Sequence, residues 1–210
     1  MAPREFLPFR KGEGNEFVER RSEANILQDK IRLYELVLGR YRQMIEHSES
    51  KTIADLKAMI RPNDETVQKA KEEITSAMRP YIYDQHFDIA AEAAHKTVRE
   101  MRTVKSLIDF WLTPKEMMNL RGGDPMDKAV FLCSLLIALD NPDSYVIVGV
   151  DSGIKVAVGY KFGEQWRLLD TTSKASVSGD KETLLKEWFG DERNIYEFNN
   201  IYYNQLKGEE

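Results

Sequence analysis

The residues with reactive side chains are few, and their number limits the chemistry that this sequence can support. The chain has one cysteine, Cys133, and three histidines, His47, His86 and His95. One cysteine forms no intrachain disulfide, and the set is too small for a Cys/His zinc cluster, so we expect no metal and no cofactor. Cys133 lies in the apolar run 129–139, which predicts a buried, unreactive thiol. We expect each histidine to be a surface or helix-capping residue.

A glycine turn precedes the most apolar helical pattern of the chain. Arg121-Gly122-Gly123-Asp124 stands where a phosphate-binding loop would open a helix, but it lacks the Lys-Ser/Thr pair of such loops, and Asp124 would repel an anion. The residues instead predict a capped helix start. Asp124 is the expected N-cap, Pro125 suits the first helical position because its missing N–H costs nothing there, and Asp127 adds negative charge to the first turn.

Composition and charge exclude several classes of function. The 210 residues are 42% hydrophobic and 31% charged, as is typical of a folded globular protein. A formal charge of −5 provides no overall field that attracts nucleic acid or anionic lipid. The longest apolar stretch, Ala129 to Leu139, is far shorter than the ~20 residues that span a bilayer, and Met1 to Glu5 carry no signal-peptide core. We therefore expect a cytoplasmic protein without a nucleic-acid or membrane partner.

Hydrophobic periodicity divides the chain into a helical half and a mixed half. Apolar residues at steps of three and four predict helices, and β-branched runs separated by turns predict a meander of three antiparallel strands. The predicted helices cover about 17–46, 53–60, 64–78, 89–110, 125–139 and 181–189, and the strands cover 145–150, 154–162 and 165–170. The organisation is an α+β fold with a flexible tail (1–15), a helical N-terminal region (16–100) and an α+β domain (101–210).

Two apolar surfaces leave alternatives open. The apolar stripe between Ile26 and Ile45 is interpreted as the packing face of a helical bundle, with a coiled coil or a partner-binding surface as the alternative. The aromatic run between Ile195 and Tyr203 predicts a final strand that closes the sheet, with an exposed contact surface as the alternative.

Four sequence segments resemble a known family in their order and spacing. They are Trp111-Leu112-Thr113-Pro114-Lys115-Glu116, Arg121-Gly122-Gly123-Asp124-Pro125-Met126-Asp127, Ile154-Lys155-Val156-Ala157-Val158 and Trp166-Arg167-Leu168-Leu169-Asp170. Together they resemble the transglutaminase-like superfamily of papain-type thiol enzymes, particularly its archaeal and bacterial members. The resemblance covers about 110–172 and implies a papain-like α+β domain with an antiparallel sheet.

The resemblance extends to one of the three catalytic positions. The family's cysteine, histidine and acidic positions correspond to Pro125, Lys155 and Asp170. Proline has no nucleophile, and a lysine ammonium beside a carboxylate is a poor base. The resemblance therefore implies the fold and argues against the thiol reaction. If the family's strand pairing holds, Lys155 and Asp170 face each other, and we expect a salt bridge in place of the His–Asp hydrogen bond.

These observations predict a catalytically inactive, transglutaminase-like protein that binds a protein or peptide through the former active-site cleft or the helical region. The residues expected to contribute to binding are Trp111, Arg121, Asp124, Lys155, Trp166 and Asp170. One alternative is an enzyme of altered chemistry built on Lys155, Asp170, Thr171 and Thr172. Another is a structural or oligomerising role of the helices, and the sequence leaves the oligomeric state open.

Overall fold

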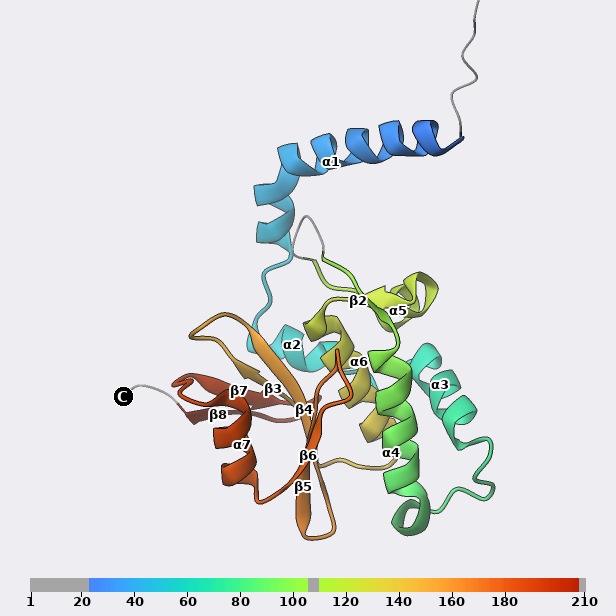
Figure 1. The fold of residues 1–210 in the computed structure, drawn as a ribbon, viewed down its shortest axis with the longest axis vertical. Helices are drawn as coiled ribbons and strands as arrows, with labels where there is room; N and C mark the ends of the chain where they lie inside the picture. The colour runs from blue at the N-terminus through green and yellow to red at the C-terminus, as the bar shows by residue number, and fades with distance from the viewer. Residues whose placement is uncertain (1–22, 106–109, 208–210) are drawn as a thin grey trace, which may run out of the picture. The chain divides into compact units, whose positions relative to one another are not determined.

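A computed structural model describes residues 23–105 and 110–207 (Figure 1). The predicted tail, 1–15, lies outside the described residues. The chain divides after Tyr41 into two units, Met1–Tyr41 and Arg42–Glu210. All the elements that form the sheet and its core belong to the second unit.

The six predicted helices are present in the described residues with shifts at their ends, and a further short helix, α5, was not predicted. Their bounds are α1 Glu23–Ser48, α2 Ile53–Met59, α3 Glu65–Thr75, α4 Tyr83–Arg99, α5 Pro114–Leu120, α6 Pro125–Ala138 and α7 Lys181–Phe189. Asp64 caps α3, because its carboxylate accepts a hydrogen bond from the backbone of Thr66 at 2.8 Å. The fourth helix begins before the predicted residue 89 and ends at Arg99, since Arg102 and Thr103 pair with the glycine turn instead.

The predicted meander is confirmed as the centre of a six-stranded antiparallel sheet. Two short parallel strands, β1 Arg102–Thr103 and β2 Gly122–Gly123, pair separately. The larger sheet has the order β6-β5-β4-β3-β7-β8, and the predicted closing strand is present as two strands, β7 and β8. Its strands are β3 Ser144–Gly149, β4 Lys155–Phe162, β5 Gln165–Leu169, β6 Ser176–Gly179, β7 Ile195–Phe198 and β8 Tyr203–Lys207.

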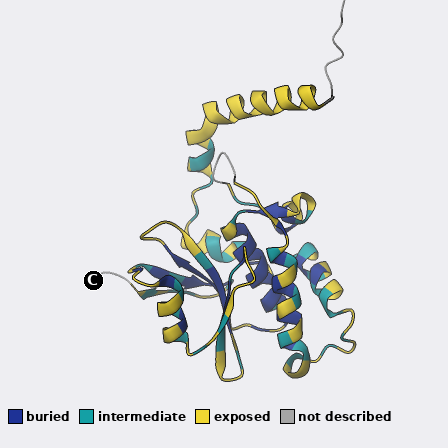
Figure 2. Cartoon of the chain, in the orientation of Figure 1, coloured by how far each residue is buried: buried dark blue, intermediate teal, exposed yellow. Residues whose placement is uncertain are grey.

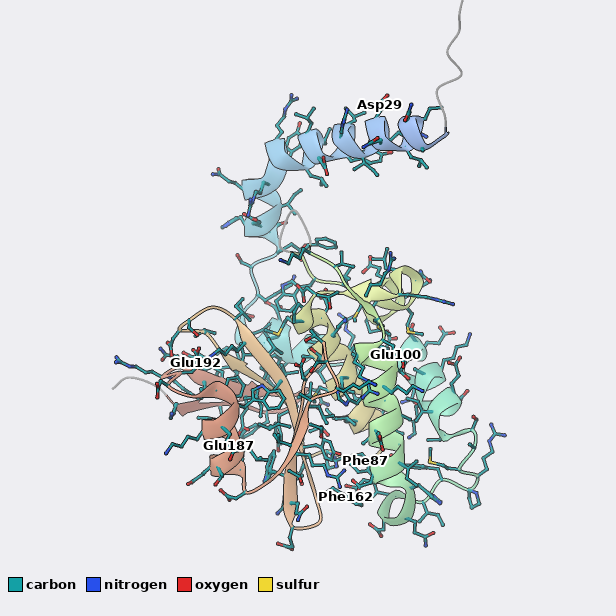
Figure 3. All side chains as sticks on the ribbon, viewed as in Figure 1. Asp29, Phe87, Glu100, Phe162, Glu187 and Glu192 are labelled. Carbon is teal, nitrogen blue, oxygen red and sulfur yellow. The ribbon has the colours of Figure 1, made fainter. Side chains whose placement is uncertain are left out.

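The core lies around α6, which is buried on almost every side (Figure 2). Helices α3 and α4 pack against α6, and α6 in turn packs against β3 and β4. Phe87 of α4 also contacts Phe162 of β4, with ring centroids 5.1 Å apart (Figure 3). The opposite face of the sheet packs against α7 through a second apolar cluster that includes Ala157, Leu168 and Phe189. The α+β class, the antiparallel sheet and the N-terminal helical region are thus confirmed.

Within the described part of the chain, no helix is long and apolar enough to cross a membrane.

Candidate functional site

The start of α6 has the predicted cap. The carboxylate of Asp124 accepts a hydrogen bond from the backbone of Asp127 at 2.8 Å, and Asp127 accepts one in return from the backbone of Asp124 at 3.2 Å. Pro125 occupies the first turn, where it removes no helical hydrogen bond. The helix start is therefore closed by two carboxylates and presents no nucleophilic side chain at residue 125.

Asp127 also attaches the preceding segment to this helix. Its Oδ1 accepts a hydrogen bond from the backbone of Leu112 at 3.0 Å, and the side chain is buried. Burial raises the pKa of Asp127 to about 6, although the hydrogen bonds from Leu112 and Asp124 act in the opposite direction. One buried carboxylate thus holds both the cap and the neighbouring Trp111 segment in position.

The end of β5 lies beside the helix start, as the resemblance implies. Thr171 donates a hydrogen bond from Oγ1 to the backbone oxygen of Pro125 at 3.2 Å. The Asp170 carboxylate accepts hydrogen bonds from Thr172 and Ser173 at 2.7–2.8 Å. Burial alone raises the pKa of Asp170, but these hydrogen bonds outweigh it and the net pKa is lowered. The Asp170 carboxylate therefore holds its own loop.

The expectation for Lys155 is corrected by the register of β4. Val156 and Val158 face the α6 core, whereas Ala157 faces the α7 cluster, so Lys155 belongs to the α7 face. Its Nζ lies 3.1 Å from Oε1 of the buried Glu192. The expected Lys155–Asp170 ion pair is not formed, because β4 pairs with β5 only from Val158 onward, where Val158 lies opposite Leu169, and Lys155 lies outside this paired part.

His95 is also corrected, because it is neither a surface residue nor a cap. It is buried in α4, and its Nε2 donates to the backbone oxygen of Asp170 at 2.6 Å. The spacing of Ala91, Ala94 and Val98 places His95 beside the buried face of the helix, a signal that the sequence contained. His86 lies half-buried in the first turn of α4, where its Nδ1 accepts from the backbone N–H of the N-cap residue Ile82 at 2.9 Å, and His47 is exposed on α1 as expected.

Lys128 is a second buried polar residue that the sequence interpretation missed. Its Nζ donates to the backbone oxygen of Met101 at 2.6 Å and to Thr103 Oγ1 at 3.1 Å. Burial lowers the pKa of this lysine, and the Asp170 carboxylate acts against that shift. Lys128 thereby attaches the end of α4 and β1 to α6. Its position between Asp127 and the apolar run 129–139 gave no indication of a partner.

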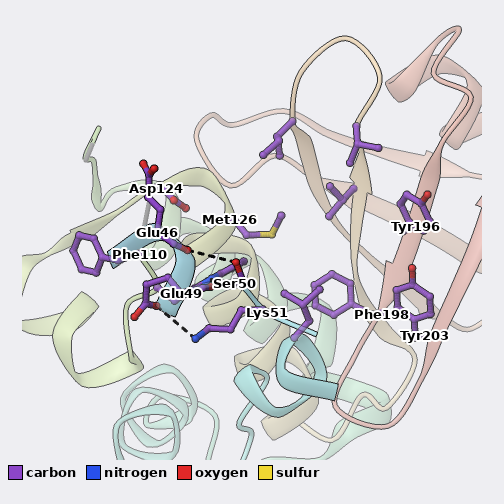
Figure 4. A pocket seen from close by; sticks show the side chains of 15 residues that line it. Glu46, Glu49, Ser50, Lys51, Phe110, Asp124, Met126, Tyr196, Phe198 and Tyr203 are labelled. Carbon is purple, nitrogen blue, oxygen red and sulfur yellow. Dashed lines mark hydrogen bonds and ion pairs between the residues drawn. The ribbon is translucent and has the colours of Figure 1, made fainter. Parts of the chain in front are cut away.

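Beside the helix start lies a cleft of about 600 Å³, formed within the unit 42–210 (Figure 4). Trp111 closes one edge, where its Nε1 donates to the backbone oxygen of Glu49 at 3.3 Å. Most lining side chains are apolar or aromatic. They are Leu56, Phe110, Trp111, Met126, Val148, Val150, Ile154, Tyr196, Phe198 and Tyr203, with Glu46, Glu49, Ser50, Lys51 and Asp124 at the polar positions.

Two of the six expected binding residues, Trp111 and Asp124, line this cleft. Arg121 ends α5 in the left-handed conformation, with φ 48°. Trp166 lies on the α7 face of the sheet, where Lys181 Nζ lies 4.3 Å from its ring centroid. Lys155 forms an ion pair with Glu192, and the Asp170 carboxylate accepts hydrogen bonds within the 171–173 loop. The residue of the matched segment 154–158 that does line the cleft is Ile154, which was not among the expected binding residues.

Cys133 is fully buried in α6, and burial raises the pKa of its thiol, as expected from its apolar neighbours. Among the residues that the structure describes, no group of three or more His, Cys, Asp or Glu side chains is arranged to hold a metal ion.

No family model and no curated protein matches the sequence. Among solved structures, the chain is similar to Legionella pneumophila LapG in its calcium-bound form, with 15% identity, a TM-score of 0.47, and coverage of 66% of this chain and 90% of that chain. The EGTA-treated form of LapG gives 14% identity, a TM-score of 0.46, and coverage of 65% and 86%. At TM-scores below 0.5 the likeness is partial, and the interpretation of the site rests on this chain's own residues.

Proposed function

We propose that this chain is a transglutaminase-like protein without thiol-enzyme chemistry, and that its cleft beside α6 binds peptide segments of other proteins. The observation that carries the proposal is the cleft itself. The cleft has a volume of about 600 Å³ and is lined mainly by apolar and aromatic side chains. It lies at the start of α6, the position at which the family that the sequence resembles carries its thiol. A cleft of this lining suits an extended segment that inserts apolar side chains.

The residues around the helix start support binding rather than catalysis. Pro125 supplies no nucleophile, and the Cys133 thiol lies in the core. The alternative of altered chemistry needs Lys155 beside Asp170. Lys155 is instead paired with Glu192 on the α7 face, so this alternative loses its expected base.

The rim of the cleft favours peptides that carry a basic residue next to the apolar ones. Glu46, Glu49 and Asp124 contribute three carboxylates to the lining, and Lys51 contributes one ammonium, 3.5 Å from Glu49. The lining therefore has an excess of negative charge, which attracts Lys or Arg. The formal charge of −5 also supports a peptide rather than nucleic acid or a membrane as partner, and a single buried thiol suits the cytoplasm.

Selection from a random octapeptide library displayed on phage tests this function. The full chain should enrich peptides that combine Phe, Leu or Trp with Lys or Arg. Fluorescein-labelled forms of these peptides should then bind in an anisotropy titration. Ile154→Lys, which places an ammonium at the cleft, should weaken binding about tenfold or more, because it buries a charge against apolar groups and repels the basic residue of the peptide.

Ile201→Lys is the matched control. Ile201 is 73% exposed and Ile154 is 74% exposed, but Ile201 does not line the cleft. The control should bind as tightly as the unmodified chain. Failure to enrich any peptide, or equal losses in the two variants, would contradict the proposed cleft.

A further inference from the structure

The apolar residues of α1 repeat in a pattern that the cleft does not use. Alternating steps of three and four residues place an apolar side chain at every a and d position of three successive heptads. We call this set the α1 seam: Ala24, Leu27, Ile31, Tyr34, Leu38, Tyr41 and Ile45. Its mean period of 3.5 residues is that of a left-handed coiled coil rather than of a single helix lying on a globular core.

The side chains of the seam from Ala24 to Tyr41 are exposed on their own helix, and Ile45 is half-buried (Figure 2). The exposed fraction is 54% for Ile31, 61% for Tyr34 and 40% for Leu38. Other apolar residues of α1 do not continue in heptads. Ile26 and Leu33 are seven residues apart, but the next residue at that spacing is Arg40. The residues seven positions before and after Leu36 are Asp29 and Gln43, which are both polar. The seam is thus the one uninterrupted heptad repeat on this helix.

The residues beside the seam specify a second copy of the same helix as the occupant. In a parallel, in-register pair, a g position of one helix meets the following e position of the other. Lys30 at g then meets Glu35 of the second copy at e, and the symmetry of the pair produces this contact twice. Val37 and Met44 occupy the next g positions and extend the apolar strip. Arg42, at the e position that Val37 meets, is paired within its own helix with Glu46 at 2.8 Å.

We infer that α1 pairs with α1 of a second copy as a parallel, two-stranded coiled coil. The seam spans 22 residues, which is roughly 33 Å of helix at ~1.5 Å per residue. Such a short coil gives a dimer that dissociates on dilution. Each dimer would carry two copies of the cleft, so a partner with two binding segments would gain avidity. The pairing itself does not depend on the peptide-binding proposal.

The mass of the full chain in solution tests the pairing. Sedimentation equilibrium should show a concentration-dependent rise from the monomer mass of 24.3 kDa to twice that value. The double substitution Ile31→Asp and Leu38→Asp should hold the chain at the monomer mass. The matched control, Leu33→Asp with Leu36→Asp, changes two exposed apolar residues of the same helix outside the seam and should leave the dimer intact. All three tryptophans lie beyond residue 41, so their fluorescence verifies that the second unit stays folded.

A charge exchange tests the register of the pair. Lys30→Glu places two like charges opposite each other twice per dimer and should raise the dissociation constant about tenfold. Adding Glu35→Lys should restore it. A mass of 24.3 kDa at every concentration would overturn the pairing. Equal effects of the seam variant and its control, or a failure of the charge exchange to rescue, would overturn it as well.

Discussion

Asp127→Asn should change how the stability of this protein depends on pH. Asp127 is buried at the helix start and receives hydrogen bonds from the backbones of Leu112 and Asp124. Burial raises its pKa from 3.8 to about 6. Because the folded-state pKa lies above the unfolded value, the folded chain binds more protons in this window. The Asp127 contribution to stability is therefore fully present below pH 3.8 and is lost as the pH rises through 6.

The size of this effect follows from the shift. A difference of roughly two pKa units corresponds to about 3 kcal/mol, of which about 2 kcal/mol falls between pH 4 and pH 7. Asparagine keeps an oxygen that accepts from Leu112 but loses the acceptor for the Asp124 backbone. That loss adds a cost that is the same at every pH, because the amide does not titrate in this range.

Urea unfolding followed by tryptophan fluorescence measures the effect. The free energy of unfolding of the natural chain minus that of the variant should fall by about 2 kcal/mol from pH 4 to pH 7. Asp191→Asn, at an exposed position, controls for the removal of a carboxylate. A difference that stays constant, or that grows with pH, would refute the assignment of a buried, proton-binding carboxyl at the helix start.

Three further predictions concern the same region and its opposite face. Thr171→Val removes the hydrogen bond to the Pro125 backbone and should lower the free energy of unfolding by about 1 kcal/mol in urea titrations; no loss would mean that β5 is not attached to the helix start there. The pKa of Glu192 is lowered, chiefly by the hydrogen bond that it accepts from Ser152, so Glu192→Gln should destabilise the chain at pH 7. In thermal melts, the difference in stability between the natural chain and this variant should disappear as the pH falls through the lowered folded pKa. A difference that persists in acid would contradict the assignment. Pro125→Cys should be alkylated by iodoacetamide faster when combined with Ile154→His than with Lys155→His, because residue 154 reaches the cleft and residue 155 faces α7; equal rates would contradict the register of β4.

The local features of the fold were predictable because they depend on neighbouring residues. Asp124 and Pro125 specify the start of α6 through capping chemistry alone, and the structure contains that cap. The three-strand meander follows from β-branched runs and turn residues in the same way. Cys133 was predictable as core because every neighbouring turn of its helix is apolar.

The parts of the site that depend on register and on distant contacts were not predictable. Whether Lys155 or Ile154 faces α6 depends on a shift of one residue, which reverses the face of every side chain in β4. His95 and Lys128 find partners far along the chain, in Asp170 and Met101, and no local pattern specifies such pairs.

The proposed cleft is tested most directly by the three indole N–H signals of the ¹⁵N-labelled chain. Trp111 lies at the edge of the cleft and donates its N–H to Glu49, whereas Trp166 and Trp188 lie with the α7 cluster on the other face of the sheet. Adding a selected peptide should shift the Trp111 signal and leave the other two in place. A peptide that binds while shifting Trp166 or Trp188 and leaving Trp111 unchanged would contradict the account.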